Sequence, residues 1–410
     1  MQRTSKMTGS RFLIVFVFGL LENARASLND LIEFCEDHWG VSISVQALDE
    51  RIHPATLTFM KQMFSLALVV LRQTVRLPVP ILTQFSAVNI TDSTGVSLPE
   101  SLADEFPGSG GDASAAAMKL QLVVDFLTGA FKAITLTDGI TPDQKATQHR
   151  QLAEPGSLNL FDLGYFVLEH LNDLAQKGAY FVCRLLLGTN LYHEDGSQVD
   201  VLALLRSETR QAFELPLRLG KKMRLPCRVC FFRTPDEVAN RRRQNANKAA
   251  AKKGRRPSKI SLELMGWTIF VTNVPASRLS LEHVALLYGV RWQIELLFKL
   301  WKSHAKIHLI SGFRKERILV ELYAKLIGLV LFQFLVMPLR AKDIDLSPTK
   351  AFKRLVKKSG ILAEALRSLH RLNKVISQIH ASILKFAKRE KRTTRVTTCQ
   401  QLLLGVNCYA

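Results

Sequence analysis

The chain has 410 residues, of which 47% are hydrophobic, so it can form two or three domains around a large buried core. Lysine and arginine number 56 against 35 acidic residues, and the formal charge of +21 favours a polyanionic partner, most commonly nucleic acid. This composition excludes a globally disordered chain, and the six scattered cysteines exclude a small disulfide-rich secreted protein.

Residues 1–82 are expected to form a helical N-terminal DNA-binding region. Apolar residues have helical spacing over 28–35, and a short helix after Ser44 is followed by a break at Pro54 and a second helix. Two short helices about a tight turn are compatible with a helix-turn-helix, and equally with an ordinary helical domain. The apolar run 12–21 is too short to span a bilayer.

The next stretch alternates strands and helices and predicts a mixed α/β sheet of the ribonuclease-H-like kind. One strand ends at Asp92, two more are joined by Thr128-Gly129 as a hairpin, and another ends at Asp162. The predicted strands cover 85–90, 119–127, 130–136, 157–161 and 179–187, and the predicted helices 141–153 and 166–176.

A β-rich insertion is predicted from about 188 to 274. It contains nine basic residues and no acidic one between 241 and 259, beginning with Arg241, Arg242 and Arg243. Such a run is either a solvated loop or helix, or an arm that contacts DNA. Cys227 and Cys230 form a CxxC without a second ligand pair, and we interpret them as packing residues.

One long helix is predicted from 281 to 307. Tyr288, Arg291, Glu295 and Lys302 fall on one narrow stripe of this helix, and the other faces are apolar. A helix of this kind should be largely buried, and a buried carboxylate must be paired or bind metal. The alternative is an ion pair between Glu295 and Arg291 on a solvated face.

Residues 311–410 are expected to form a basic, helical C-terminal region with 20 basic and 6 acidic residues. Its apolar run 319–338 is interrupted by Glu321 and Lys325, so we predict a buried helix and no membrane span. The catalytic domain is therefore predicted at 83–310.

Three carboxylates are candidates for metal ligands: Asp92 and Asp162 at strand ends and Glu295 on the long helix. Hard divalent ions prefer oxygen ligands, and two such ions can activate the attacking oxygen and stabilise the leaving oxygen of a phosphoryl transfer. Each aspartate alone could also be a helix cap or turn residue. Asp138 precedes a glycine and ranks lower, since Asp-Gly is an ordinary turn pair.

The segment from Tyr288 to Lys302 resembles the Tyr-x2-Arg-x3-Glu-x6-Lys signature of bacterial insertion-sequence transposases of family four, which have an Asp-Asp-Glu triad. The motif at 91–94 is similar to the first aspartate motif of that family, and the motif at 162–165 is similar to the second. Leu163 departs from the pattern, because many relatives have arginine there.

The resemblance implies cut-and-paste transposition by strand nicking, hairpin formation and strand transfer. Asp92, Asp162 and Glu295 would hold two Mg²⁺ ions, with Mn²⁺ able to substitute. Tyr288, Arg291 and Lys302 would contact phosphates, and Trp267 would stack on a flipped base unless it is a core tryptophan. The partners implied are double-stranded DNA, as element ends and as target, and a second copy of the chain in a paired-end dimer.

Two alternatives remain beside this hypothesis: an inactive or inhibitory DNA-binding relative, and a ribonuclease-H-like nuclease without strand transfer. No targeting signal is evident, and the few cysteines suit a reducing compartment. We therefore expect a cytoplasmic, nucleoid-associated bacterial protein with no membrane role.

Overall fold

The computed structural model of the chain describes residues 6–110, 114–390 and 400–402. The chain divides into two compact units, each built from separated segments. Unit 1 contains Met1–Pro78, Ser93–Thr141 and Gln293–Arg395. Unit 2 contains Val79–Asp92, Pro142–Trp292 and Val396–Ala410.

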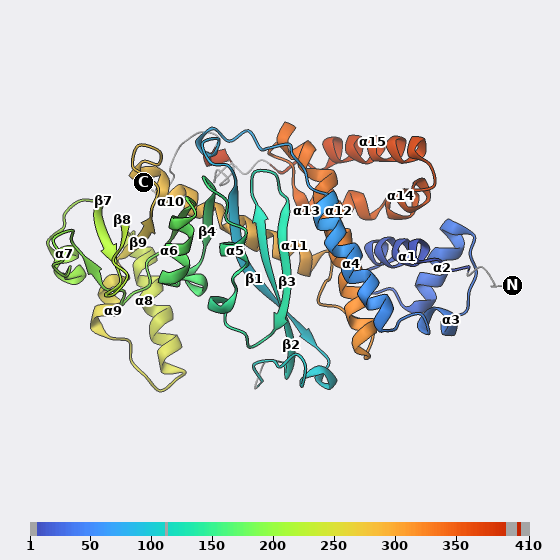
Figure 1. Cartoon of the computed structure of the whole chain (residues 1–410), viewed down its shortest axis with the longest axis horizontal. Coiled ribbons are helices and arrows are strands. Elements are labelled where there is room, and N and C mark those ends of the chain that lie inside the picture. The colour runs from blue at the N-terminus through green and yellow to red at the C-terminus, as the bar shows by residue number, and fades with distance from the viewer. Residues whose placement is uncertain (1–5, 111–113, 391–399, 403–410) are drawn as a thin grey trace. The chain divides into compact units, whose positions relative to one another are not determined.

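Unit 1 is mainly helical, and its helices come from both ends of the sequence. In Figure 1, α4 lies beside α12, and α1 packs on α2, α12 and α14. The helices are α1 (Gly9–Glu22), α2 (Leu28–Trp39), α3 (Val45–Asp49), α4 (Pro54–Val70), α11 (Trp292–Ser303), α12 (Lys315–Lys342), α13 (Pro348–Val356), α14 (Ser359–Ala365) and α15 (Leu369–Phe386). The N-terminal and C-terminal helical regions predicted from the sequence therefore share one core.

Capping residues set the ends of the first helices. Ser27 and Asp30 form a reciprocal capping box at the start of α2, and Gly40 ends that helix in the left-handed conformation. Pro54 occupies the first turn of α4, where its missing N–H leaves no hydrogen bond unmade. The predicted short helix, break at Pro54 and second helix are confirmed.

The longest helix, α12, is apolar enough to span a membrane by length and composition. However, 78% of its most apolar 18-residue window is buried inside the protein. Arg317, Glu321 and Lys325 are charged residues buried along this helix. The predicted buried helix is confirmed.

A β-hairpin completes unit 1. Strands β2 (Ala116–Asp125) and β3 (Phe131–Asp138) are antiparallel, as predicted. Gly129 has a φ of 68°, and a Cβ there would clash with the Met337 side chain on α12. The turn therefore requires glycine both for its backbone conformation and for its close approach to that helix.

Backbone hydrogen bonds join the strands in the order β3-β2-β1-β4-β5-β9-β8-β7-β6, a mixed sheet that confirms the predicted α/β class. β1 (Val88–Leu98) changes unit after Asp92. In unit 2, β1, β4 and β5 are parallel, and the remaining strands are antiparallel. These strands are β4 (Leu158–Phe161), β5 (Tyr180–Arg184), β6 (Leu191–Tyr192), β7 (Ala212–Leu219), β8 (Leu225–Arg233) and β9 (Trp267–Thr272).

The predicted β-rich insertion continues the sheet of unit 2, because β9 pairs directly with β5. A single apolar core joins both parts and includes Phe161, Phe181, Phe231 and Trp267. Cys227 and Cys230 are buried free thiols in β8, consistent with packing residues, and burial raises the pKa of both. Cys399 and Cys408 lie outside the described residues.

The helices of unit 2 are short or surface-lying. They are α5 (Gln148–Gln151), α6 (Leu168–Gln176), α7 (Val201–Ser207), α8 (Asp236–Ala251), α9 (Lys259–Leu264) and α10 (Leu281–Val290). The 3₁₀ helices of the described residues are η1 (Pro80–Leu82), η3 (Asp143–Lys145) and η4 (Leu163–Tyr165) in unit 2 and η2 (Glu100–Leu102) in unit 1.

Three elements were predicted with the wrong bounds. The helix expected over 141–153 is only η3 and α5, because Pro142 and the turns around it interrupt the helix. The strand expected to end before Asp92 continues to Leu98. The single helix expected over 281–307 is two helices, α10 and α11, which meet at Arg291.

A buried histidine pair lies behind β4. His149 is 1% exposed, neither of its ring nitrogens has a hydrogen-bond partner, and its ring lies 5.3 Å from that of His170. The pKa of His149 is lowered to about 3, mainly by burial and to a smaller extent by the nearby His170 and Arg150.

This burial predicts acid sensitivity. Above pH 6.5 His149 is neutral in both the folded and unfolded chains; below it, only the unfolded chain binds the proton, so stability falls as pH drops toward about 3. We expect His149→Leu to reduce the loss of unfolding free energy between about pH 7 and about pH 4 by on the order of 3 kcal/mol. Urea unfolding at the two pH values measures this, with the exposed His193→Leu as control. An unchanged pH dependence in His149→Leu would contradict the assignment.

Candidate active site

Asp92 lies within β1, at the point where its pairing with β4 ends. Thr91 and Phe161 are the last register partners of these two parallel strands, and Asp92 and Asp162 are the next residues of each. Adjacent strands are about 4.8 Å apart, and register partners in parallel strands point to the same face. The register therefore gives the two aspartates neighbouring places where the pairing of β1 with β4 ends, in unit 2.

Asp162 also caps the 3₁₀ helix that follows it. Its backbone is extended, with a φ of −87° and a ψ of −177°, and its Oδ1 accepts a hydrogen bond of 2.8 Å from the Gly164 backbone N–H. This bond fixes one oxygen of the carboxylate.

Gly164 is needed because of a close contact rather than an unusual backbone angle. A Cβ at this position would lie 3.0 Å from Asp162 Oδ1 and 3.3 Å from Asp143 Oδ2. Asp143, which lies on the other side of this glycine, was not predicted from the sequence as a site residue. That residue belongs to a stretch expected to be helical, and no motif marked it.

Arg291 forms an ion pair with Asp92 across 3.1 Å, from Nη1 to Oδ2. Both side chains are mostly buried, with exposures of 15% for Arg291 and 16% for Asp92. A charge-assisted contact in this environment is stronger than an exposed pair. The Arg291 guanidinium therefore already balances the charge of Asp92.

Tyr288 precedes Arg291 by one turn and belongs to the same part of unit 2. Its ring lies 4.9 Å from the ring of Phe270 and 5.8 Å from the Arg291 guanidinium carbon. Burial raises the pKa of Tyr288 to about 12, and Arg291 and Arg184 lower it while Asp162 raises it. The phenol therefore stays protonated at neutral pH and lies among the charges around the two aspartates. Arg184, at the end of β5, was not predicted from the sequence.

Glu295 and Lys302 lie on α11, which belongs to unit 1. Glu295 is partly buried, and burial lowers the pKa of Lys302. The expectation that this helix is largely buried holds for one side of α11, where Phe298 and Trp301 are buried, whereas Trp292 is 54% exposed and Leu296 is 44% exposed.

Trp267 is a core residue of the insertion. It is 7% exposed, its ring meets Phe213 edge-on at 5.9 Å, and the Arg233 guanidinium carbon lies 4.6 Å from its ring centroid. These contacts support the core interpretation of this tryptophan.

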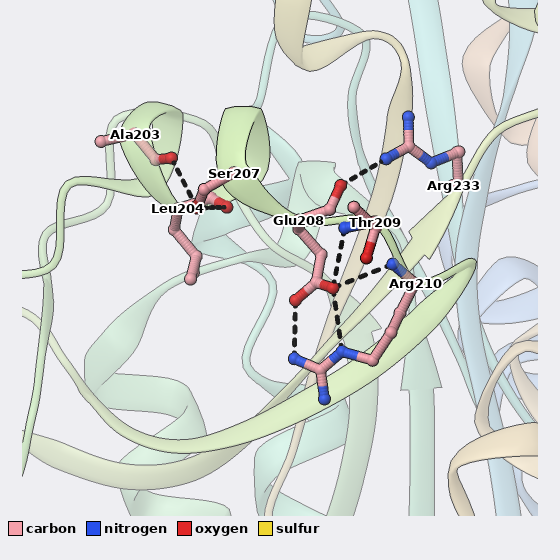
Figure 2. A network of polar contacts seen from close by, with 7 residues as sticks. All are labelled: Ala203, Leu204, Ser207, Glu208, Thr209, Arg210 and Arg233. Carbon is pink, nitrogen blue, oxygen red and sulfur yellow. Dashed lines mark hydrogen bonds and ion pairs between the residues drawn. The ribbon is translucent and has the colours of Figure 1, made fainter.

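Arg233 is itself anchored on the segment before β7. Figure 2 shows its Nη2 donating to the backbone oxygen of Glu208, across 2.7 Å. The Glu208 carboxylate in turn accepts from the Arg210 guanidinium and from two backbone N–H groups. The side-chain hydrogen bond from Arg210 contributes most to lowering the pKa of Glu208 to about 2. The Arg233 guanidinium over Trp267 is therefore held in place by the hydrogen bonds around Glu208.

The three arginines that begin the basic run differ in environment. Arg242 donates to the hydroxyls of Thr234 and Thr268, and Arg243 donates to the Leu262 carbonyl and to Asn240. Arg241 is exposed on α8 and pairs weakly with Glu237 across 3.4 Å. Two of the three arginines therefore hold α8 against its neighbours, a role that the charge run did not reveal.

Asp92 and Asp162, both in unit 2, carry carboxylate oxygens, which are donors of the hard type that Mg²⁺ prefers. The Arg291 guanidinium beside Asp92 supports the fit, since this carboxylate is already arranged to contact a cation. In the part of the chain that the structure describes, no group of three or more His, Cys, Asp or Glu residues is close enough together to hold a metal ion.

Comparison with known proteins adds independent information. The sequence profile of the family described as "Transposase DDE domain" matches residues 83–331, more than half of the chain. The chain is 29% identical to the transposase for insertion sequence element IS231B of Bacillus thuringiensis subsp. berliner, over 97% of this chain and 88% of the relative. It is 28% identical to the IS1151 transposase of Clostridium perfringens, over 98% and 91% of the two chains. A putative transposase for IS186A of Escherichia coli (strain K12) is 24% identical over 68% and 72%.

The Asp92–Arg291 pair predicts energetic coupling within unit 2. In a double-mutant cycle of Asp92→Asn and Arg291→Gln, we expect a coupling free energy of unfolding of about 1 kcal/mol or more, because both groups are mostly buried. The exposed Glu237–Arg241 pair is the control and should give a value near zero. Additive effects at Asp92 and Arg291 would show that the ion pair has no energetic role.

Proposed function

This chain belongs to the DDE transposase family, and we propose that it moves a bacterial insertion sequence by cut-and-paste phosphoryl transfer. The observation that carries the proposal is the pairing of Thr91 with Phe161, which gives Asp92 and Asp162 adjacent places on parallel strands. Paired aspartates are also what a nuclease of similar fold would need. The relatives, named as insertion-sequence transposases over nearly the whole chain, favour strand transfer in addition to cleavage.

Within the insertion-sequence transposases, we assign the chain to family four. This assignment rests on the spacing of Tyr288, Arg291, Glu295 and Lys302, which satisfies the Tyr-Arg-Glu-Lys signature at all four positions.

Asp92, Asp162 and Glu295 are the proposed metal ligands. Two Mg²⁺ ions, when bound, would supply activation of the attacking oxygen and stabilisation of the leaving one, and Mn²⁺ would substitute. The Gly164 N–H leaves Asp162 Oδ2 available while it fixes Oδ1. Arg291 balances the charge of Asp92, the role that a bound cation would share.

The proposed reaction has four transfers at phosphorus. Water attacks at the element end and releases a 3′-OH, and this hydroxyl attacks the opposite strand, closing a hairpin and releasing the flanking DNA. A second water reopens the hairpin, and the freed 3′-OH attacks the target, so each step forms one P–O bond and breaks another. The protein supplies position and charge, which carry most of the catalysis in phosphoryl transfer.

Tyr288, Arg291 and Lys302 are the proposed phosphate contacts near the transferred strand. Tyr288 is suited to donate a hydrogen bond, because its phenol stays protonated over the physiological pH range. Arg291 can exchange its carboxylate partner for a phosphate, which a guanidinium binds equally well. Contact of Trp267 with a flipped base would require Arg233 to leave its ring.

The partners proposed are double-stranded DNA and a second copy of the chain, since two element ends must be joined together. We propose that residues 1–82 and the basic region 311–410 bind DNA or pair the two copies, on either side of a catalytic domain at 83–310. Among the arginines at 241–243, the exposed Arg241 is the one suited to contact DNA.

The carboxylates provide the central test. Asp92→Asn, Asp162→Asn and Glu295→Gln should each reduce metal-dependent nicking of an element-end duplex by about three orders of magnitude or more, because each removes a charged ligand. Binding of the same duplex in a chelator should stay within a few-fold of the unsubstituted chain. A strand-transfer assay with pre-cleaved ends separates a transposase from a nuclease. Robust cleavage by any of the three variants would refute its assignment as a ligand.

Gly164 tests how closely Asp162 must be held. Gly164→Ala adds a methyl 3.0 Å from Asp162 Oδ1, so the carboxylate must shift, and a misplacement of this size lowers the nicking rate by up to about 10²-fold. Gly95→Ala has open space for its methyl and no positive φ, and it is the control for adding a side chain to a glycine without a close contact. Equal nicking rates for Gly164→Ala and the unsubstituted chain would show that the position of Asp162 is not critical.

A further inference from the structure

The segment after α11 has an unusual backbone. This segment, 304–311, follows the helix that carries Glu295 and Lys302. Lys306 has a φ of 50°, a conformation that residues other than glycine rarely adopt. Such strain persists only where the surrounding structure holds it, and it is found most often at functional sites.

Three buried charges on α12 hold this segment. Arg317, Glu321 and Lys325 are spaced four residues apart on one face of the helix and are at most 7% exposed. Glu321 pairs with Arg317 and accepts a hydrogen bond of 3.0 Å from the Ser311 backbone N–H. Lys325 donates to the carbonyls of Lys306 and Leu309.

Burying three charged side chains on this face costs more free energy than burying apolar side chains would. Each buried charge therefore needs a partner, and removing one partner leaves the other charge buried without compensation. Only one of these four contacts is within α12; the other three fix backbone groups of 306, 309 and 311. The charged face therefore positions the segment rather than stabilising the helix alone.

Lys306 and His308 of this segment, Lys302 of α11 and Arg25 of the turn between α1 and α2 form a group of basic side chains that interact electrostatically, which we call the α11 cluster. Arg25 is exposed, as is His308, and the other two are partly buried. Burial lowers the pKa of His308, and Lys306, Lys302, Lys325 and Arg25 lower it in the same direction. Like charges held this close repel one another, so their arrangement favours an anionic partner.

We propose that the α11 cluster is a preformed binding surface for the phosphate backbone of duplex DNA, held open for it by Arg317, Glu321 and Lys325. The inference rests on the proposed function and extends it from Lys302 to Arg25, Lys306 and His308, which the signature does not include. Several cations spaced along one surface suit successive phosphates of a strand better than a single small anion. Binding here would anchor DNA beside the helix that carries Glu295.

Charge-removing variants of the full chain test the proposal. Lys306→Gly removes one charge and also relieves the strained φ, so this variant is expected to fold. Arg25→Gln removes one charge at an exposed position, and Lys374→Gln does the same on α15 as the matched control. The probe is a duplex oligonucleotide of arbitrary sequence, with binding measured over a range of salt concentrations in a chelator, so that cleavage does not contribute.

We expect the slope of log K against log salt concentration to fall by about 0.9 in Lys306→Gly and in Arg25→Gln, and to stay unchanged in Lys374→Gln. Lys306→Arg keeps the charge, so its slope should equal that of the unsubstituted chain. Equal slopes in all the variants would overturn this inference while leaving the proposed transposition intact. Displacement of the duplex by inorganic phosphate at constant ionic strength would also overturn it, in favour of a small-anion site. Absence of any duplex binding by the unsubstituted chain would overturn the proposed function as well.

Discussion

The pairing of β1 with β4 is the constraint on which the candidate site depends. Parallel strands cannot be joined by a short turn, so the two aspartates are far apart in the sequence although they follow register partners. A shift of one residue in this register would turn one aspartate to the opposite face of the sheet. A buried polar contact supports the register, because Asn89 Nδ2 donates to Oδ1 of its register partner Asn159 across 3.0 Å, and a shift would break this bond.

The polar groups around Asp92 and Asp162 have partners within the protein itself. Arg291 neutralises Asp92, the Gly164 N–H supports Asp162, and Tyr288 remains a neutral donor. In unit 1, the charges on α12 have a comparable function, since they are bonded to backbone groups of the segment that follows α11. In both places, polar groups that would destabilise an isolated core gain partners that fix a functional segment.

The insertion shows how a basic sequence can serve structure. Arg233 covers Trp267, Arg242 joins two threonines, and Arg243 holds the end of α9. Each of these arginines has a long apolar side chain that can pack on its neighbours and a planar guanidinium that donates hydrogen bonds in fixed directions. The cations beyond them, from Lys248 to Arg256, are exposed and available to a polyanion.

Much of the molecule could be predicted from local patterns. The α/β class, the Thr128-Gly129 hairpin, the helices on both sides of Pro54 and the buried nature of α12 depend on hydrophobic period, turn residues and caps, which are properties of neighbouring residues. The spacing from Tyr288 to Lys302 is likewise a local feature. The break at Arg291 was missed because the backbone there keeps right-handed helical angles, and the nearest glycine, Gly289, lies inside α10 rather than at the break.

Other features depend on contacts between distant segments, and tertiary structure alone decided them. The ion partner of Arg291 is 199 residues away in the chain, and the partner that covers Trp267 comes from another strand. Glu321 and Lys325 are interruptions of an apolar run in the sequence, but in the fold they are the groups that hold Lys306 and Ser311. Sequence patterns identify which residues are charged or buried, whereas the free energy of a buried charge depends on which group lies opposite it, and only the folded chain determines that.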